Sequence, residues 1–385
     1  MGRIDDKTPS NSPSMGRIER MVAELCPEGV PMVTLGEVCL SIKTGKLNAN
    51  AKEENGQYPF YTCDAEPYRI NTYAFDCEAI LVTGNGSQVG HINYYKGKFN
   101  AYQRTYVLSK FDESINIFYA LHYFKAYLKD YILLNSKKGS IPYITLPMLL
   151  EFQISLPPLP VQEAIVEILE KFDRLSAELQ AELQARKQQY EYYRNQLLTR
   201  FAPDQPVTEY SLGELCEIGT GSHNTQDGMT EGDYPFYTRG IEILRLNCYD
   251  YDEKAVITAG DGAGVGKVIH YVDGKYALHQ RAYRLVANES MLLPRYLYYY
   301  MNATFYDFIM RSSVSSSVTS VRRPMLVNYP IKLPSIEEQA RIVAILDKFE
   351  TLVNDLSQGL PAEIAAVQEQ YEYYRNKLLT FKTKE

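Results

Sequence analysis

The chain has 385 residues, of which 45% are hydrophobic, and a formal net charge of -7 at pH 7. This length and composition are typical of a folded protein of two or three domains. The acidic balance argues against a protein that coats nucleic acid without selectivity, because such binding depends on an excess of Lys and Arg, but a selective reader stays possible.

Cysteine, histidine and hydropathy patterns narrow the class further. The 6 cysteines include no C-x-x-C pair, which argues against a zinc ribbon or thioredoxin-like redox site and favours a reducing compartment. The 5 histidines are scattered without metal-ligand spacing, so we expect no metal site. No apolar run reaches the roughly 18 residues of a membrane span, and the first residues are polar. We therefore expect a cytoplasmic protein with neither membrane span nor signal peptide.

The first part of the chain is predicted to be a solvated tail followed by one short helix. Residues 1–18 contain the tetrapeptide MGRI twice, with a stretch of Pro, Ser and Asn between the copies. Residues 18–26 have the pattern of an amphipathic helix, which the turn Pro27-Glu28-Gly29 would end.

An internal repeat organises the rest of the sequence. The decapeptide YEYYRNQLLT begins at Tyr190 and returns as YEYYRNKLLT at Tyr371. Upstream matches share an offset of 176 or 177 positions, as in G-x-G-x-x-x-G at Gly84 and Gly260. The segments between the matches differ freely, so the sequence predicts a duplicated framework that carries two different sets of loops.

Each copy is predicted to be an α/β domain. Strand-like runs at residues 79–83 and 255–258 lead into the glycine-rich turns, and Tyr-rich helices are expected at about residues 117–134 and 295–310. Short strand signals then lead to Leu156-Pro157 and Leu333-Pro334, where the prolines mark a boundary.

Two long helical patterns follow these boundaries, the first over residues 162–198, or about 55 Å of helix. Apolar residues recur in steps of three and four, as in a coiled-coil seam, with a four-residue stutter on a tandem Ala-Glu-Leu-Gln at residues 177–184. Gly359 and Pro361 indicate a kink or break in the second pattern. The expected seam includes Ile165, Phe172, Leu179, Tyr190, Tyr193, Leu197, Ile342, Phe349, Tyr371, Tyr374 and Leu378.

No catalytic constellation is present in the sequence. The turn that begins at Gly84 lacks the third glycine of a dinucleotide fingerprint and is followed by a β-like run rather than a helix. There is no phosphate-binding G-x-x-x-x-G-K-[ST] motif, no G-x-S-x-G, and no Asn-Pro-Pro or Asp-Pro-Pro tetrad of amino-methyltransferases. We therefore expect a protein that binds rather than an enzyme, with the glycines serving as structural turns.

Polar and basic residues lie at comparable places in the two copies. A basic segment precedes each proline boundary, and Gln-Arg pairs follow the glycine-rich turns. Lys, Arg and Ser bind phosphate oxygens, whereas Arg pairs with guanine and Gln with adenine. Any one of these residues could equally be an ordinary solvated side chain. The candidate DNA-binding residues are Gln88, Gln103, Arg104, Lys137, Lys138, Ser140, His279, Gln280, Arg281, Arg311, Arg322 and Arg323.

The duplicated helix segments carry a family resemblance. LPPLPVQEAIVEILEKFD from Leu156 and LPSIEEQARIVAILDKFE from Leu333 are each followed by YEYYRN and LLT, and a variable α/β segment precedes each. On these motifs the chain resembles the DNA specificity subunit of type I restriction-modification systems, from about Ile18 onwards. The resemblance implies an α/β, pseudo-twofold fold with two tandem target recognition domains, separated by two long antiparallel helices that form a coiled coil. The implied domains are residues 19–158 and 201–334, and the implied spacer helices lie in residues 159–200 and 335–385.

The same resemblance implies a function without catalysis in this chain. Each domain would read one half of an asymmetric bipartite site in double-stranded DNA. The helices would set the spacing between the two half-sites and bind modification subunits, of which we expect two. S-adenosylmethionine and ATP would be bound by the modification and restriction partners rather than by this chain.

Polar residues lie beside the tyrosines of the repeated decapeptide and are predicted to face away from the helix seam, where a partner could bind them. We expect contacts to the modification subunits at Glu191, Arg194, Asn195, Glu372, Arg375 and Asn376. A different class of function stays open on the residues alone: a peptide-binding adaptor on a coiled coil, without nucleic acid, which the acidic balance favours slightly and the paired basic segments oppose.

Overall fold

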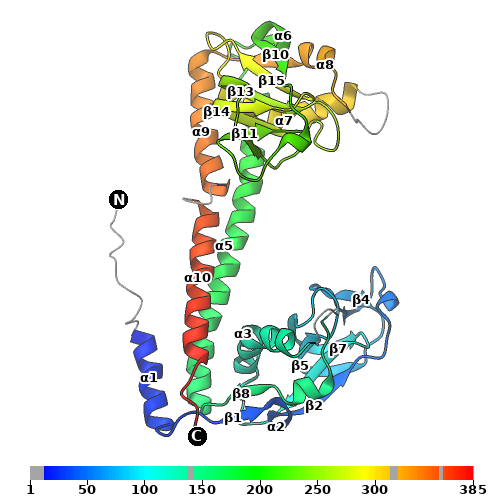
Figure 1. Cartoon of the computed structure of the whole chain (residues 1–385), viewed down its shortest axis with the longest axis vertical. Coiled ribbons are helices and arrows are strands. Elements are labelled where there is room, and N and C mark those ends of the chain that lie inside the picture. Colours follow the sequence, from blue (N-terminus) through cyan, green and yellow to red (C-terminus); the bar gives the residue numbers. More distant parts are fainter. Residues whose placement is uncertain (1–12, 137–141, 313–319, 355–358, 385) are drawn as a thin grey trace. The chain divides into compact units, whose positions relative to one another are not determined.

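The structure is a computed structural model that describes residues 13–136, 142–312, 320–354 and 359–384 (Figure 1). The chain divides into two units, which we call unit 1 (Met1–Glu178 with Ile364–Glu385) and unit 2 (Leu179–Glu363). Among the described residues, no helix combines the length and the apolar character needed to span a membrane.

Unit 1 begins with helix α1 (Pro13–Leu25), drawn in blue in Figure 1. It starts at Pro13 rather than near Ile18, because proline is well suited to the first turn of a helix. Ile18 is buried in the same core cluster as Leu378. Val30, just beyond α1, exchanges main-chain hydrogen bonds with Lys382 and Lys384 at 2.8 and 3.0 Å, so the last residues of the chain close unit 1.

A six-stranded mixed sheet forms the body of unit 1, in the order β2-β7-β5-β6-β3-β4. Its strands are β2 (Cys39–Thr44), β3 (Tyr58–Tyr61), β4 (Tyr68–Ile70), β5 (Phe75–Thr83), β6 (Ile92–Ala101) and β7 (Thr105–Phe111). Only β3 and β6 pair in parallel. Along β5, Ile80 and Val82 face one core cluster and Ala79 and Leu81 another, as the two-residue period of a strand requires.

Several short elements and one long helix complete the α/β part of unit 1. They are β1 (Met32–Thr34), which pairs with β8 (Gln153–Ser155), α2 (Leu35–Val38), η2 (Ala49–Ala51), α3 (Ile117–Asn135) and α4 (Leu146–Leu150). The side chain of Asn116 caps α3 by accepting the N–H groups of Phe118 and Tyr119. The buried Tyr119 hydroxyl donates to the Ser155 carbonyl at 2.8 Å, which fixes α3 against β8.

Unit 2 repeats this topology, with a sheet in the order β10-β15-β13-β14-β11-β12. Its elements are β9 (Thr208–Ser211), α6 (Leu212–Leu215), β10 (Cys216–Thr220), η3 (Thr225–Asp227), β11 (Tyr234–Tyr237), β12 (Leu244–Leu246), β13 (Tyr251–Ala259), β14 (Ile269–Leu278), β15 (Ala282–Ala287), α7 (Pro294–Ser312), α8 (Arg323–Val327) and β16 (Pro330–Leu333). Tyr296 binds the Lys332 carbonyl at 3.0 Å as Tyr119 binds that of Ser155. The duplicated α/β framework predicted from the sequence is confirmed.

Long helices follow each sheet. Helix α5 (Leu159–Thr199) contributes its first half to unit 1 and its second half to unit 2. The second spacer segment is two helices, α9 (Ile336–Asn354) in unit 2 and α10 (Leu360–Leu379), which lies mostly in unit 1. A break therefore lies before Pro361, in the region where the sequence allowed either a kink or a break.

The expected seam residues differ in burial. Ile165 and Ile342 are fully buried, Tyr190 and Tyr371 are buried, and Phe172, Leu179, Phe349 and Tyr374 are half-buried. Within unit 1, the ring of Phe172 lies 5.5 Å from that of Tyr374. Within unit 2, Tyr193 packs 5.9 Å from Phe349 but keeps 41% exposure. Leu198 is fully buried where we expected Leu197, because the end of α5 also packs on the α/β core.

Two matched glutamines join the long helices to the α/β cores. Gln162 in α5 is 0% exposed, donates to the carbonyls of Ser114 and Pro157 at 2.8 and 2.7 Å, and accepts the Asn116 N–H. Gln339 in α9 makes the same three bonds in unit 2, with Met291, Pro334 and Leu293. Each amide thus satisfies three main-chain groups at the junction of helix and core.

Gln162→Leu should destabilise unit 1 by about 2–4 kcal/mol, because leucine fills the space but leaves the three main-chain groups without a partner. Urea unfolding of the full chain, followed by circular dichroism, measures the change. Gln188→Leu, at an exposed position of the same helix, is the control and should change the free energy of unfolding by less than about 0.5 kcal/mol. Equal losses for both variants would contradict this role of Gln162.

Candidate functional site

Three turns converge beside the sheet of unit 1, and we call them turn cluster 1. The glycine-rich turn joins the antiparallel strands β5 and β6, a second turn joins β6 to β7, and the third follows β2. The Gly84 N–H donates to the Arg104 carbonyl at 2.8 Å, and the Gln103 N–H donates to the Leu47 carbonyl at 3.0 Å. Gly86 has a φ of 86°, a conformation that favours glycine. The glycines therefore shape a turn.

Turn cluster 1 presents a small polar hollow. Gln103 and Arg104 are exposed, and they line a cavity of about 300 Å³ together with Gly84 and Tyr106. The Gln103 side chain donates to the Asn48 amide oxygen at 3.0 Å. Gln88 is exposed on the glycine-rich turn. This surface can present amide and guanidinium groups to a ligand.

The equivalent turns of unit 2 form turn cluster 2, which repeats this arrangement with different neighbours. The Gln280 side chain donates to the Asn224 amide oxygen, as Gln103 does to Asn48. Gln280, Arg281 and Arg239 line a polar cavity of about 610 Å³. Asp261, on the glycine-rich turn, accepts one hydrogen bond from Arg239 and one from Arg281, each of 2.8 Å.

The electrostatics of turn cluster 2 follow from burial and pairing. Partial burial acts to raise the pKa of Asp261, but the hydrogen bonds from Arg239 and Arg281 outweigh it and hold that pKa below its usual range. Burial lowers the pKa of His279. The Nδ1 atom of this side chain accepts a hydrogen bond of 3.0 Å from the main-chain N–H of Arg281. His279 is only 3% exposed and therefore shapes the turn from within.

The remaining predicted DNA-binding residues are divided between two places. Arg322 and Arg323 are exposed at the start of α8, and the neighbouring Val321 N–H donates to the Gly260 carbonyl at 2.8 Å, beside turn cluster 2. Arg311 is exposed in the last turn of α7. Lys137, Lys138 and Ser140 lie outside the described residues.

Sequence reasoning missed four residues of the turn clusters: Asn48, Asn224, Arg239 and Asp261. Asn48 and Asn224 fall at the repeat offset of 176 and could have been found as a shared pair. Arg239 and Asp261 have no counterpart of the same type, since Cys63 and Asn85 occupy the matching positions. Only the fold brings them together.

The predicted partner residues lie on the helices. Glu191, Asn195, Glu372 and Asn376 are exposed. Arg194 stacks on the Tyr190 ring and Arg375 on the Tyr371 ring, each with 5.5 Å from guanidinium to ring centre. The Nε of each of these arginines is buried and has no hydrogen-bond partner among the described residues. Each copy therefore has an arginine that stacks on a tyrosine and has an unpaired Nε among the described residues.

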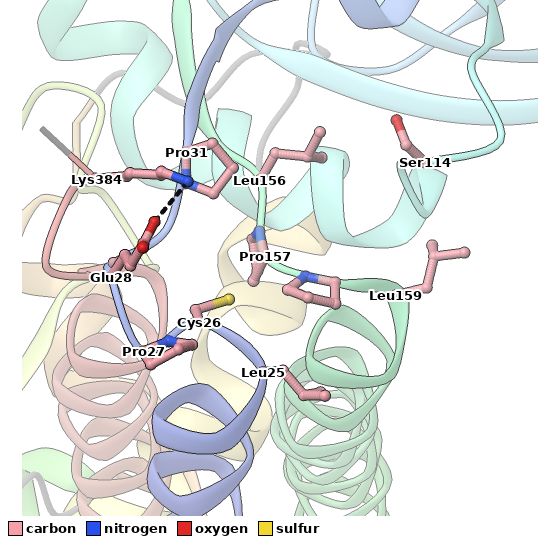
Figure 2. A pocket seen from close by; sticks show the side chains of 12 residues that line it. Leu25, Cys26, Pro27, Glu28, Pro31, Ser114, Leu156, Pro157, Leu159 and Lys384 are labelled. Atoms are coloured by element: carbon pink, nitrogen blue, oxygen red, sulfur yellow. Dashed lines mark ion pairs between the residues drawn. The ribbon is translucent and has the colours of Figure 1, made fainter.

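A separate groove of about 640 Å³ lies in unit 1 where α1 ends and α5 begins, as Figure 2 shows. Leu25, Leu156 and Pro157 supply apolar walls, and Glu28 forms an ion pair of 2.8 Å with Lys384. Its lining includes no residue of either turn cluster. Across the described part of the chain, no group of three or more His, Cys, Asp or Glu side chains is placed to hold a metal ion.

The fold and the turn clusters define a duplicated α/β protein with two differently equipped polar surfaces. The Type I restriction modification DNA specificity domain family matches residues 27–186 and 205–366. The chain belongs to this family.

Curated relatives agree with this assignment. A putative type I specificity subunit of Mycoplasma pneumoniae is 30% identical, over 81% of this chain and 96% of the relative. A putative type I restriction enzyme specificity subunit of Haemophilus influenzae is 28% identical, over 85% and 89%. A type I restriction enzyme specificity subunit of Escherichia coli is 34% identical, but the match covers 58% of this chain and 60% of the relative.

Solved structures share the fold. The S subunit of a type I restriction-modification system from M. genitalium aligns with a TM-score of 0.60 at 17% identity, over 91% of this chain and 96% of that chain. A chain solved in a study of complex assembly and conformational transition of the type I system aligns with a TM-score of 0.63 at 17% identity, over 91% and 97%. The α/β architecture with long helices is therefore that of type I specificity subunits.

Proposed function

We propose that this chain is the non-catalytic specificity subunit of a type I restriction-modification complex. Each unit reads one half of a bipartite, asymmetric site in double-stranded DNA through its turn cluster, and the long helices set the distance between the half-sites. The supporting observation is that the same Gln–Asn pair recurs in both clusters while the residues around it differ. A shared scaffold with unlike side chains suits two unlike base sequences.

The chemistry of the turn clusters favours base reading over peptide binding. Exposed Gln103 and Gln280 keep amide groups that can pair with adenine, and exposed Arg104 and Arg281 can donate two bonds to guanine. Both cavities are lined mainly by polar side chains, whereas peptides bound as an added strand or as a helix in a groove need a free strand edge or an apolar groove.

The helices are proposed to bind two modification subunits, and restriction subunits can join the complex. S-adenosylmethionine and ATP are proposed to be bound by these partners. The docking role is supported by exposed Glu191 and Asn195 beside Arg194, which recur as exposed Glu372 and Asn376 beside Arg375.

Selection from random double-stranded DNA tests the proposed reading. The full chain, alone and with a co-expressed modification subunit, should select a bipartite site and bind it less tightly as salt rises. Gln280→Ala should relax one half-site by about tenfold and Gln103→Ala only the other, because one bidentate base contact discriminates by about 1–3 kcal/mol. Absence of DNA binding at low salt in both preparations would leave the peptide-binding adaptor as the better account.

A second prediction concerns the spacing of the half-sites. Insertion of a third Ala-Glu-Leu-Gln after Gln184 should lengthen the preferred gap by one or two base pairs, because four helical residues add about 6 Å and one base-pair step about 3.4 Å. The same selection experiment reads the gap directly. An unchanged gap with a normal affinity would sink the proposed role of α5.

The docking role is tested by Arg194→Ala with Arg375→Ala. Loss of the two guanidinium groups should weaken association with the modification subunit at least tenfold in co-purification and titration calorimetry. Arg341→Ala is the control, because Arg341 already pairs with Glu338 on its own helix at 2.6 Å. Equal weakening by both changes would argue for a general effect on charge.

A further inference from the structure

Turn cluster 2 contains a cationic pair that turn cluster 1 lacks. Asp261 Oδ1 lies 2.8 Å from an Nη1 of Arg239, and its Oδ2 lies 2.8 Å from the Nη1 of Arg281. The Asp261 side chain is 19% exposed, against 39% for Arg239 and 64% for Arg281. One carboxylate at the base of the cluster therefore holds two outward-facing guanidinium groups.

We propose that Arg239 and Arg281, oriented by Asp261, form a guanine-reading element of unit 2. This inference rests on the proposed function and specifies its substrate: one half-site must contain guanine where the element contacts the major-groove edge. Arg281 reads the base, Arg239 supports the reading from the opposite side of the carboxylate, and Asp261 is a positioning residue.

The hydrogen-bond geometry leaves the correct donors for guanine. Asp261 engages each arginine through Nη1 alone, and the described residues provide no other side-chain partner for Arg239 or Arg281. The Nε–Nη2 edge of each guanidinium thus keeps two parallel N–H donors. Guanine offers O6 and N7 as two adjacent acceptors, and a bidentate arginine is the commonest specific contact to this base.

Charge distinguishes guanine from phosphate at this place. The two arginines and Asp261 together carry a single net positive charge, so the carboxylate offsets half of the attraction for a phosphate. A guanine edge has no net charge, so the Asp261 carboxylate weakens binding to it only slightly. The same carboxylate restricts the rotamers of the long arginine side chains. The arrangement favours a fixed direction of donation over strength of attraction.

Unit 1 shows what the same framework does without this element. Cys63 and Asn85 replace Arg239 and Asp261, and the Cys63 thiol donates to the Asn85 amide oxygen at 2.8 Å. Because Asn85 stands where unit 2 has Asp261, this position offers no carboxylate to Arg104, the residue that matches Arg281. The guanine-reading element therefore belongs to the half-site of unit 2 alone.

Half-site selection with the full chain and its modification subunit tests the proposal. Wild-type protein should select a guanine that Asp261→Asn and Arg281→Lys each make less preferred by about tenfold. The other half-site should stay unchanged in the same selected molecules. Asn is a conservative choice, because it stands at the matching position of unit 1. Arg245→Lys is the control, since Arg245 donates to the main-chain carbonyls of Gly232 and Asp233.

The slope of binding against salt separates base reading from phosphate contact. Arg281→Ala should leave this slope unchanged, because a guanidinium that contacts a base edge neutralises no phosphate, whereas loss of a phosphate contact would reduce the slope by about 1. The proposal is overturned if Arg281→Lys and Asp261→Asn weaken binding equally for all sequences, or if neither half-site loses guanine. Wild-type protein that selects no sequence at all would instead refute the proposed function itself.

Discussion

The arrangement of each unit depends on one buried amide at the start of a long helix. Gln162 and Gln339 are both 0% exposed, and each bonds three main-chain groups of its own unit. A buried polar group without partners is costly, so the helix, the Leu-Pro junction and the loop before the Tyr-rich helix must keep one geometry. The attachment of a long helix to a recognition core is thereby made rigid.

This constraint explains which parts of the repeat can vary. Tyr119 and Tyr296 extend the same fixed junction, because each donates from the Tyr-rich helix to the last strand of its unit. The side chains of Cys63 and Arg239 take no part in these junction hydrogen bonds, so Cys63 can stand where unit 2 has Arg239 without loss of the sheet. Under the proposed function, different base preferences can therefore arise on one framework by exchange of a few turn residues.

The sequence predicted most of the framework but little of the site. The repeated spacing, the strand-like runs and the helical periodicity can be read directly from the residues, so the two α/β domains and the helices α3, α5 and α7 could be expected from the sequence alone. The start of α1 at Pro13 was missed because the sequence between the MGRI copies is rich in turn-forming residues. Leu198 was missed because a heptad pattern identifies only the residues that face a partner helix. The end of α5 also packs against the α/β core of unit 2. Asp261 and its two arginines come from turns about twenty residues apart, and no local sequence pattern predicts that these turns lie close together.

The balance of charges also suggests how affinity and selectivity are divided under the proposed function. In turn cluster 2 a carboxylate already engages both arginines, and the whole chain is acidic, with a net charge of -7. Non-specific attraction to DNA grows with the number of unpaired cations that contact phosphates, and this chain commits part of its arginine to orientation instead. Such a protein discriminates between sequences better than it holds DNA. Under the proposed function, tight binding then depends on partner subunits that supply the phosphate contacts.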